Sequence, residues 1–277
     1  MTITSRQNPL VARFRNAARG NAGGLLLLDG AHLVADALGA RVTVQLAAVT
    51  PAAHDKDDLR ELLAGLARAG VEVVTVSATV MDAISPVRSS SAIVALAERP
   101  ARANERIFAG QAPLVVIAVD VQDPGNVGAI VRVAEAGGAS GVVAAGGSAD
   151  PFSWKALRGS MGSALRLPII SGIDADAAFA DARRHGCRIL ATVPREGRSL
   201  FDVRLTGAVA VLVGSEGHGL AAPLVAAADE RVTIPMQAPV ESLNAAVTAA
   251  LLVYEAARQR QRRPEGLQEH DGFPLSR

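Results

Sequence analysis

The chain has 277 residues, more than the usual size of one domain, so its length predicts two domains. Hydrophobic residues make up 49% and charged residues 20%, which excludes a disordered chain and suits a globular enzyme with a sizeable core. The formal net charge of +1 does not by itself indicate a nucleic-acid partner, and the lone Cys187 excludes a disulfide framework or a cysteine-rich metal site.

Residues 1–98 predict a basic arm and a small α/β domain. Residues 1–20 hold four arginines and no acid, so we expect a weakly packed arm or short helix whose arginines contact phosphates; the alternative is a solvated terminus. From residue 21 to 98, apolar runs alternate with helical patterns, which is typical of a layered α/β domain. We expect strands at 25–28, 42–49, 71–76 and 91–96, and helices at 31–38, 57–69 and 79–84. No apolar run here could span a bilayer and no signal-peptide pattern opens the chain, so the expected location is the cytoplasm, with no membrane contact.

A charged stretch with a proline predicts a linker at 99–112. A second unit, 113–262, begins with a continuous apolar run that ends in an acid, as a strand buried on both faces of a parallel sheet does. A flexible tail is expected at 263–277. Further strands are expected at 141–145, 188–193, 209–214 and 231–234, and helices at 127–136, 153–160, 174–185, 220–228 and 242–260.

The first polar segment follows the strand at 113–120. Asp-Pro-Gly at 123–125 predicts a tight turn, and Asn126 lies at the start of the next helix, where it can cap the helix or face a ligand. Arg132 shares a helix face with Gly128 and points toward the edge of the sheet where ligands of open α/β sheets bind. The turn lacks the Gly-x-Gly-x-x-Gly fingerprint, which disfavours a nucleotide-dependent dehydrogenase.

The second polar segment is the loop Gly-Ser-Glu-Gly-His-Gly at 214–219, after an apolar run. Its glycines leave backbone N–H groups free to approach a polar ligand closely. Glu216 is a candidate to bind a ligand hydroxyl or to orient Arg132. Ser215 does not fit the Gly-x-Ser-x-Gly pattern of a nucleophile elbow, and His218 is a less favoured candidate for a general base.

The third segment, Ile-Pro-Met-Gln-Ala-Pro-Val-Glu-Ser-Leu-Asn at 234–244, leads into the final helix. Ser242 or Asn244 is expected to cap that helix. Its apolar positions fall near one face, which fits a core face or an interface with a second copy equally well. These positions are Leu243, Val247, Ala250, Leu251 and Tyr254.

Two other features have a structural and a functional interpretation. Lys155, Arg158 and Arg166 form a basic stretch without acids, which suits a track for phosphates or an ordinary amphipathic helix and turn. Cys187 lies two residues from His185, but no cysteine-enzyme signature surrounds the pair, so a buried structural thiol is expected.

Taken together, the three segments resemble the SpoU (TrmH-type) RNA ribose 2′-O-methyltransferases of the SPOUT class. The matching motifs are Asn-x-Gly-x-x-x-Arg from Asn126 to Arg132, Gly-Ser-Glu-Gly at 214–217, and Ile-Pro-Met…Glu-Ser-Leu-Asn at 234–244. The resemblance covers residues 113–262. Residues 21–98 also resemble, more weakly, the family's substrate-binding domain, a small α/β unit similar to RNA-binding ribosomal proteins. The implied fold is α/β, with a parallel-sheet domain in a trefoil knot that periodicity cannot indicate.

The resemblance further implies that S-adenosylmethionine is the cofactor and that its methyl group goes to a ribose 2′-hydroxyl in structured RNA, with 23S-type rRNA favoured. It implies a homodimer and no metal. The cofactor contacts would come from Thr192, Gly214, Ile234, Leu243 and Asn244, and catalytic roles map to Asn126, Arg132, Glu216, Ser242 and Asn244.

Arg132 occupies a position sometimes assigned as the general base in this family. A guanidinium keeps its proton, so we expect Arg132 instead to hold a phosphate and the developing oxyanion. Two alternatives stay open: a tRNA-directed enzyme of the same family, and a non-catalytic RNA-binding protein with the same fold.

Overall fold

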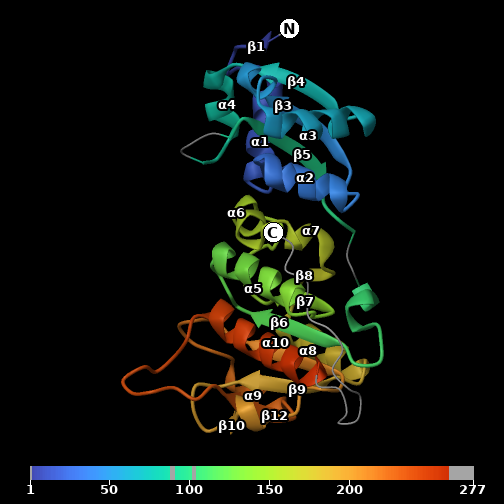
Figure 1. The fold of residues 1–277 in the computed structure, drawn as a ribbon. Helices are drawn as coiled ribbons and strands as arrows, with labels where there is room; N and C mark the ends of the chain where they lie inside the picture. Colours follow the sequence, from blue (N-terminus) through green and yellow to red (C-terminus); the bar gives the residue numbers. More distant parts are fainter. Residues whose placement is uncertain (1, 88–90, 102–103, 262–277) are drawn as a thin grey trace.

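The N-terminal apolar runs form a five-stranded mixed sheet in the computed structural model, which describes residues 2–87, 91–101 and 104–261 (Figure 1). The strand order is β1-β4-β3-β5-β2; β5 runs antiparallel to both of its neighbours, and the other pairs are parallel. The strands are β1 (Thr2–Ile3), β2 (Leu25–Asp29), β3 (Val44–Val49), β4 (Glu72–Val76) and β5 (Ile93–Glu98). The helices are α1 (Pro9–Ala18), α2 (Ala31–Gly39), α3 (Asp57–Arg68) and α4 (Ala78–Ile84).

The first twenty residues differ from the expected weakly packed arm. β1 pairs with β4, and α1 buries Val11 and Phe14 in the core of the N-terminal domain. Arg6 and Arg15 donate to the backbone oxygens of Thr79 and Ala83 at either end of α4, so two of the four arginines bind protein. Basic composition alone had suggested an arm because it does not show the apolar face of the same helix.

The second apolar series forms a seven-stranded, all-parallel sheet with the order β10-β12-β9-β11-β6-β7-β8. This confirms the expected fold class, a small α/β domain followed by a parallel-sheet domain. The strands are β6 (Leu114–Val119), β7 (Gly141–Ala145), β8 (Ile169–Ile173), β9 (Arg188–Thr192), β10 (Arg198–Ser199), β11 (Val209–Val213) and β12 (Glu230–Thr233).

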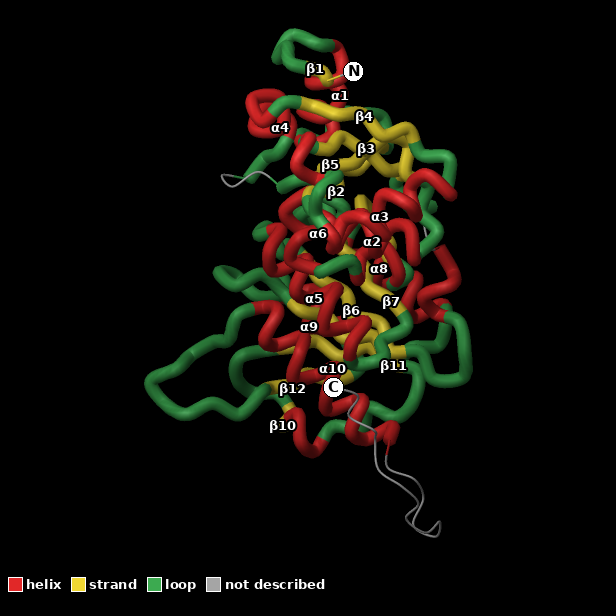
Figure 2. The backbone as a smooth tube through the Cα atoms, turned by 45° about the horizontal axis from the view of Figure 1, so that its top comes forward, coloured by secondary structure: helices red, strands yellow, loops and turns green. Residues whose placement is uncertain are grey.

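The helices cover both faces of this sheet because successive strand residues point to opposite faces. In β6, Leu114, Val116 and Ala118 face the core shared with α5 and α10, whereas Val115 and Ile117 face α8 and α9. The helices are α5 (Pro124–Ala136), α6 (Trp154–Ser160), α7 (Ser163–Arg166), α8 (Ala175–Arg184), α9 (Ala222–Ala227) and α10 (Ala245–Gln261). After β12, the chain returns through a projecting loop to place α10 on α5 (Figures 1 and 2).

Helices α6 and α7 lie between the two domains (Figure 1). Trp154 of α6 packs against the core of the N-terminal domain. Arg166 of α7 bridges Asp36 of α2, at 2.9 Å, and Glu135 of α5, at 2.8 Å. Arg99, just after β5, makes a bidentate ion pair with Asp150 at 2.7 and 2.9 Å. Apolar packing and ion pairs therefore join the domains.

Two arginines near the end of α10 also make contacts within the protein. Arg258 pairs with Glu255 at 2.6 Å, and Arg260 donates to the backbone oxygens of Leu205, Ala112 and Gly207. Arg262, Arg263 and the predicted tail at 263–277 lie outside the described residues.

Cys187 is a buried thiol in the core beneath the sheet, as expected, and burial raises its pKa. His185 does not activate it, because its ring stacks on Phe108 at 4.3 Å and its Nδ1 contacts the backbone oxygen of Asp181. Within the described ranges, no helix has the length and apolarity needed to cross a membrane.

Candidate active site

The three polar segments meet at the carboxyl edge of the parallel sheet. β6, β11 and β9 are adjacent, and β12 pairs with β9, so the loops that follow β6, β11 and β12 leave the sheet on the same side. The first loop leads into α5, the second is glycine-rich, and the third leads into α10. Ligands of open α/β sheets bind at this edge.

A hydrogen-bonded network links one residue from each segment. The amide of Asn126 donates to Oε1 of Glu216 at 2.7 Å. Nδ2 of Asn244 donates to the same carboxylate oxygen and to Oδ1 of Asn126, the latter at 3.1 Å. The backbone N–H of Ala245 also reaches Glu216, at 3.4 Å. Asn244 thus forms one polar cluster with Glu216 and Asn126, which precede it by 28 and 118 positions in the sequence.

The starts of α5 and α10 position the residues of this network, and backbone N–H groups fix the orientation of the Asn244 amide. Asn244 caps α10, because its Oδ1 accepts from the N–H groups of Ala246 and Val247 at 2.9 and 3.2 Å. Its Nδ2 must then point at Glu216. Asp123 caps α5 by accepting from the backbone N–H of Asn126 at 2.9 Å. The Glu216 carboxylate lies at the N-terminus of α10, where the helix dipole favours negative charge.

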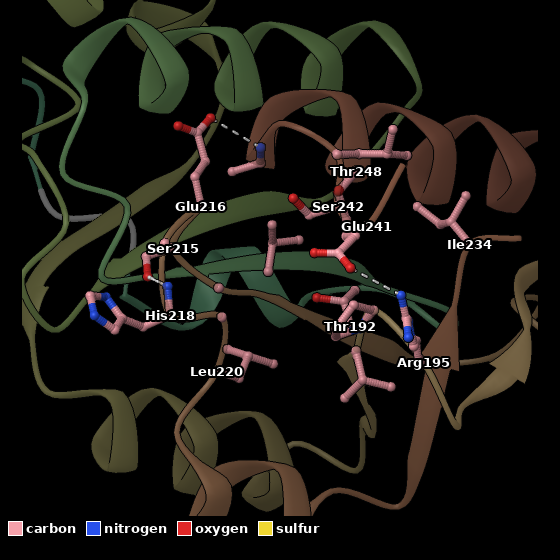
Figure 3. A pocket seen from close by; sticks show the side chains of 18 of the residues that line it. Thr192, Arg195, Ser215, Glu216, His218, Leu220, Ile234, Glu241, Ser242 and Thr248 are labelled. Carbon is pink, nitrogen blue, oxygen red and sulfur yellow. Dashed lines mark hydrogen bonds and ion pairs between the residues drawn. The ribbon is translucent and has the colours of Figure 1, made fainter. Parts of the chain in front are cut away.

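Beside this network lies a pocket of about 460 Å³ (Figure 3). Four residues expected to hold a cofactor line it: Thr192, Gly214, Ile234 and Leu243. Glu216 and Ser242 line it too, so the polar network and the pocket share Glu216. The pocket walls are largely apolar side chains and backbone, contributed also by Val193, Val213, Leu220, Val225, Val232 and Met236.

Gly214 is required by the shape of the glycine-rich loop. A Cβ at this position would lie 2.4 Å from the carbonyl carbon of Gly219 and 2.6 Å from the nitrogen of Leu220. The loop folds back on itself because Gly219 donates to the backbone oxygen of Ser215 at 2.9 Å. Because glycine has no side chain, Gly214 lines the pocket with its backbone.

Ser242 and His218 both line the pocket. The hydroxyl of Ser242 makes no hydrogen bond to any other described residue, so it is available to a ligand or a water. His218 is exposed in the turn of the glycine-rich loop, where its backbone N–H donates to Oγ of Ser215 at 3.3 Å (Figure 3).

Arg132 is not brought into the pocket. It is exposed on α5 and makes no hydrogen bond or ion pair within the described ranges. On the same helix face, Gly128 lies against α6, where a Cβ would come within 2.4 Å of the backbone oxygen of Ala156. Arg132 therefore stands outside the pocket, on the helix that begins at Asn126.

The basic stretch around α6 is only partly free. Arg166, for which a phosphate track was one of two interpretations, bridges Asp36 and Glu135. Lys155 and Arg158 are exposed, and Lys155 lies 5.6 Å from the centre of the Trp154 ring. The sequence could not show that two acids distant along the chain pack beside Arg166.

Two charged residues of the pocket were not predicted from the sequence as site residues, although Glu241 belongs to the third motif. Arg195, in the loop after β9, and Glu241, in the loop before α10, approach each other to 3.4 Å (Figure 3). Glu241 directly precedes Ser242, and this adjacency was a usable signal. No local sequence pattern indicated Arg195, because the loop after β9 reaches the pocket through its contacts with the neighbouring strand β12.

Comparison with known proteins agrees with this geometry. Residues 113–254 match the SpoU rRNA Methylase family. The chain is 32% identical over 93% of its length to an uncharacterized tRNA/rRNA methyltransferase of Synechocystis, covering 94% of that protein. It is 32% identical over 86% of its length to the 23S rRNA (guanosine-2′-O-)-methyltransferase RlmB of Burkholderia, covering 98% of that protein.

A solved structure is similar over nearly the whole chain. The SpoU methyltransferase AviRb of Streptomyces viridochromogenes, in complex with AdoMet, matches 92% of this chain and 98% of its own, with a TM-score of 0.81 and 27% identity. Both domains are thus shared with relatives, in the same order. The chain belongs to the SpoU family of RNA 2′-O-methyltransferases.

Proposed function

We propose that this chain transfers a methyl group from S-adenosylmethionine to a ribose 2′-hydroxyl of structured ribosomal RNA. The observation that carries the proposal is the Asn126–Glu216–Asn244 network, built from the three motifs beside one pocket. The alternative, a non-catalytic RNA-binding protein with the same fold, does not require three separate loops to be joined through the carboxylate of Glu216.

The pocket fits the cofactor in size and in chemistry. Sites for small molecules measure about 300–1,000 Å³ and combine apolar walls with a few polar groups, as this pocket does. The backbone at Gly214 can make hydrogen bonds with the edge of the adenine ring, and the apolar side chains of Ile234 and Leu243 can pack against its faces. When bound, the sulfonium of S-adenosylmethionine supplies an electrophilic methyl group.

The chain's residues then have distinct roles. Asn126, Asn244 and Glu216 hold the loops together beside the reacting centre, and the fixed amides offer polar contacts to the ribose. Arg132, outside the pocket and unpaired within the described ranges, binds the neighbouring phosphate and the oxyanion that develops on the 2′-oxygen. As the oxygen–methyl bond forms and the methyl–sulfur bond breaks, the 2′-hydroxyl proton passes to the phosphate, to Ser242 or to a water.

Ribosomal RNA is favoured by the N-terminal domain. The match to the Burkholderia 23S rRNA enzyme covers 86% of this chain, so it extends from the C-terminal domain into the N-terminal one. Aromatic residues are only 3% of the sequence, so base stacking cannot dominate recognition. Contacts with shape and phosphates favour a folded RNA. A tRNA substrate is the second candidate, and the cytoplasm is the proposed location for either.

The proposed assembly is a homodimer. Val247, Leu251 and Tyr254 form an apolar stripe on α10, and their exposed fractions are 46%, 41% and 54%. Spacings of four and three residues place them along one helix face. An apolar face left open on a central helix is best explained by a second copy.

The decisive experiment compares rRNA and tRNA from cells with and without the gene. Ribose 2′-O-methylation is mapped at nucleotide resolution, and purified protein with labelled S-adenosylmethionine is then asked to restore the missing mark. Loss and restoration of one mark in rRNA support the proposal. A restored mark confined to tRNA would select the second candidate, and no methylation of either RNA would reject both.

A further inference from the structure

The pocket contains a cation that the proposed reaction has not used. Among the described residues that line it, Arg195 is the only arginine or lysine. The lining carboxylates are Glu216 and Glu241. Glu216 is engaged by Asn126 and Asn244, so the remaining charged pair is Arg195 with Glu241.

The backbone on both sides of Arg195 is anchored to β12. Val193 donates to the backbone oxygen of Val232 at 2.9 Å, and Gly197 donates to Oγ1 of Thr233 at 2.9 Å. A Cβ on Gly197 would lie 2.6 Å from that same hydroxyl. The loop is therefore held tightly against the sheet edge, with Arg195 presented between its two anchors at the pocket.

The pair between Arg195 and Glu241 is weak. Its atoms are 3.4 Å apart, and the two side chains are 73% and 82% exposed. Ion pairs this exposed to solvent contribute little to stability. A ligand carboxylate that enters the pocket can therefore displace Glu241 and take a bidentate pair with the guanidinium at little cost.

The proposed cofactor carries such a group. Its amino-acid end has an α-carboxylate and an α-ammonium, whereas its adenosine part is neutral and suits the apolar and backbone walls. We infer that Arg195 binds the α-carboxylate of the cofactor and exchanges its contact with Glu241 for that group. This inference rests on the proposed function, since it names a contact of the same cofactor.

Two thioether ligands can test the contact with Arg195 separately from the other contacts of the pocket. S-adenosylhomocysteine keeps the amino-acid end, and 5′-methylthioadenosine replaces it with a methyl group. Dissociation constants of both are measured by calorimetry for the native protein and for Arg195→Met. We expect the substitution to weaken S-adenosylhomocysteine about tenfold, the loss of one charge-assisted contact, and to leave 5′-methylthioadenosine within about twofold.

Arg198→Met is the matched control. Arg198 is 57% exposed on the neighbouring β10, pairs with Glu230, and does not line the pocket, so its loss should change neither constant. Equal weakening of both ligands by Arg195→Met would overturn the inference, because it would report a general distortion of the pocket. Unchanged binding of both would also overturn it, including the case in which only RNA binding falls. If the native protein bound neither ligand, the proposed function itself would fail.

Discussion

At the scale of single residues, Arg132 tests the division between cofactor and RNA sites. Because it lies outside the pocket, Arg132→Ala should leave the dissociation constant of S-adenosylhomocysteine unchanged. Methyl transfer should fall by about 10²–10³-fold, the usual cost of one group that stabilises a developing oxyanion. Binding is measured by calorimetry, and single-turnover rates with labelled cofactor. Unchanged turnover would remove Arg132 from the mechanism. Arg184→Ala, exposed on α8 at the opposite face of the sheet, is the control.

Asn244 both caps α10 and binds Glu216, so its replacement should change the stability, the cofactor affinity and the methylation rate. Asn244→Ala removes the cap of α10, which costs about 1 kcal/mol of unfolding free energy. It also releases Glu216 and the preceding Leu243 of the pocket, so cofactor binding and rate should both fall. Asn244→Asp separates these effects, since it keeps a capping oxygen but sets a second carboxylate against Glu216. If it restored full binding, the amide donor would be irrelevant.

At the scale of elements, Gly128 fixes the contact between α5 and α6. Gly128→Ala would push a methyl group to 2.4 Å from the backbone oxygen of Ala156, and such overpacking costs about 1–3 kcal/mol. Gly39→Ala is the control, because nothing lies within 4 Å of its Cβ position at the end of α2. Urea unfolding should show a loss for Gly128→Ala alone. Equal midpoints for the two variants would show that α6 shifts freely.

Elements differed in how well the sequence predicted them. The strands at 114–119, 141–145 and 209–213 were predicted because each is a run of apolar residues, buried on both faces. β8 was missed: its residues Ile-Ile-Ser-Gly-Ile carry a glycine at positive φ, and its pairing with β7 is irregular. β10 has only two residues and exists through its pairing with β12. Such pairings are properties of the sheet and leave no local pattern.

The site followed the same rule. Residues within motifs, such as Asn126 and Asn244, were predicted because capping and glycine-loop chemistry has a local pattern. Their mutual contact through Glu216 needed the order of the strands. The contacts of Arg166 are likewise set by distant partners, Asp36 and Glu135, so the local sequence left its role open between phosphate binding and an ordinary helix and turn.

At the scale of the whole molecule, the ion pairs of Arg166 make domain packing sensitive to acid. Burial raises the pKa of Glu135 and is the largest single effect, but the hydrogen bonds from Arg166 and Ser163 and the positive charge of Arg166 together outweigh it. The net pKa of Glu135 therefore lies below the usual value. Because the pKa of Glu135 is lower in the folded than in the unfolded protein, its ionised carboxylate stabilises the fold at pH values above the unfolded pKa of about 4.3. This stabilisation is lost as the pH falls through the pKa of the folded protein.

Glu135→Gln should therefore reduce the unfolding free energy at pH 7, and its difference from the native protein should shrink below about pH 4. Urea unfolding from pH 3 to 7 measures this. Glu61→Gln, exposed on α3, should show no such convergence. A constant difference across the range would mean that Arg166 does not depend on the charge of Glu135.

The apolar stripe of α10 makes the last prediction, on assembly. Leu251 lies between Val247 and Tyr254 and is 41% exposed, so Leu251→Glu places a charge at the centre of the proposed interface. Since α10 packs on α5 and is capped by Asn244, separating the copies should also lower the methylation rate. Sedimentation velocity should show the native chain as a dimer and the variant as a folded monomer. Ala64→Glu adds the same charge to an exposed position of α3 and should stay dimeric. A monomeric native protein, or a dimeric Leu251→Glu protein, would show that the apolar stripe of α10 is not the interface between two copies of this chain.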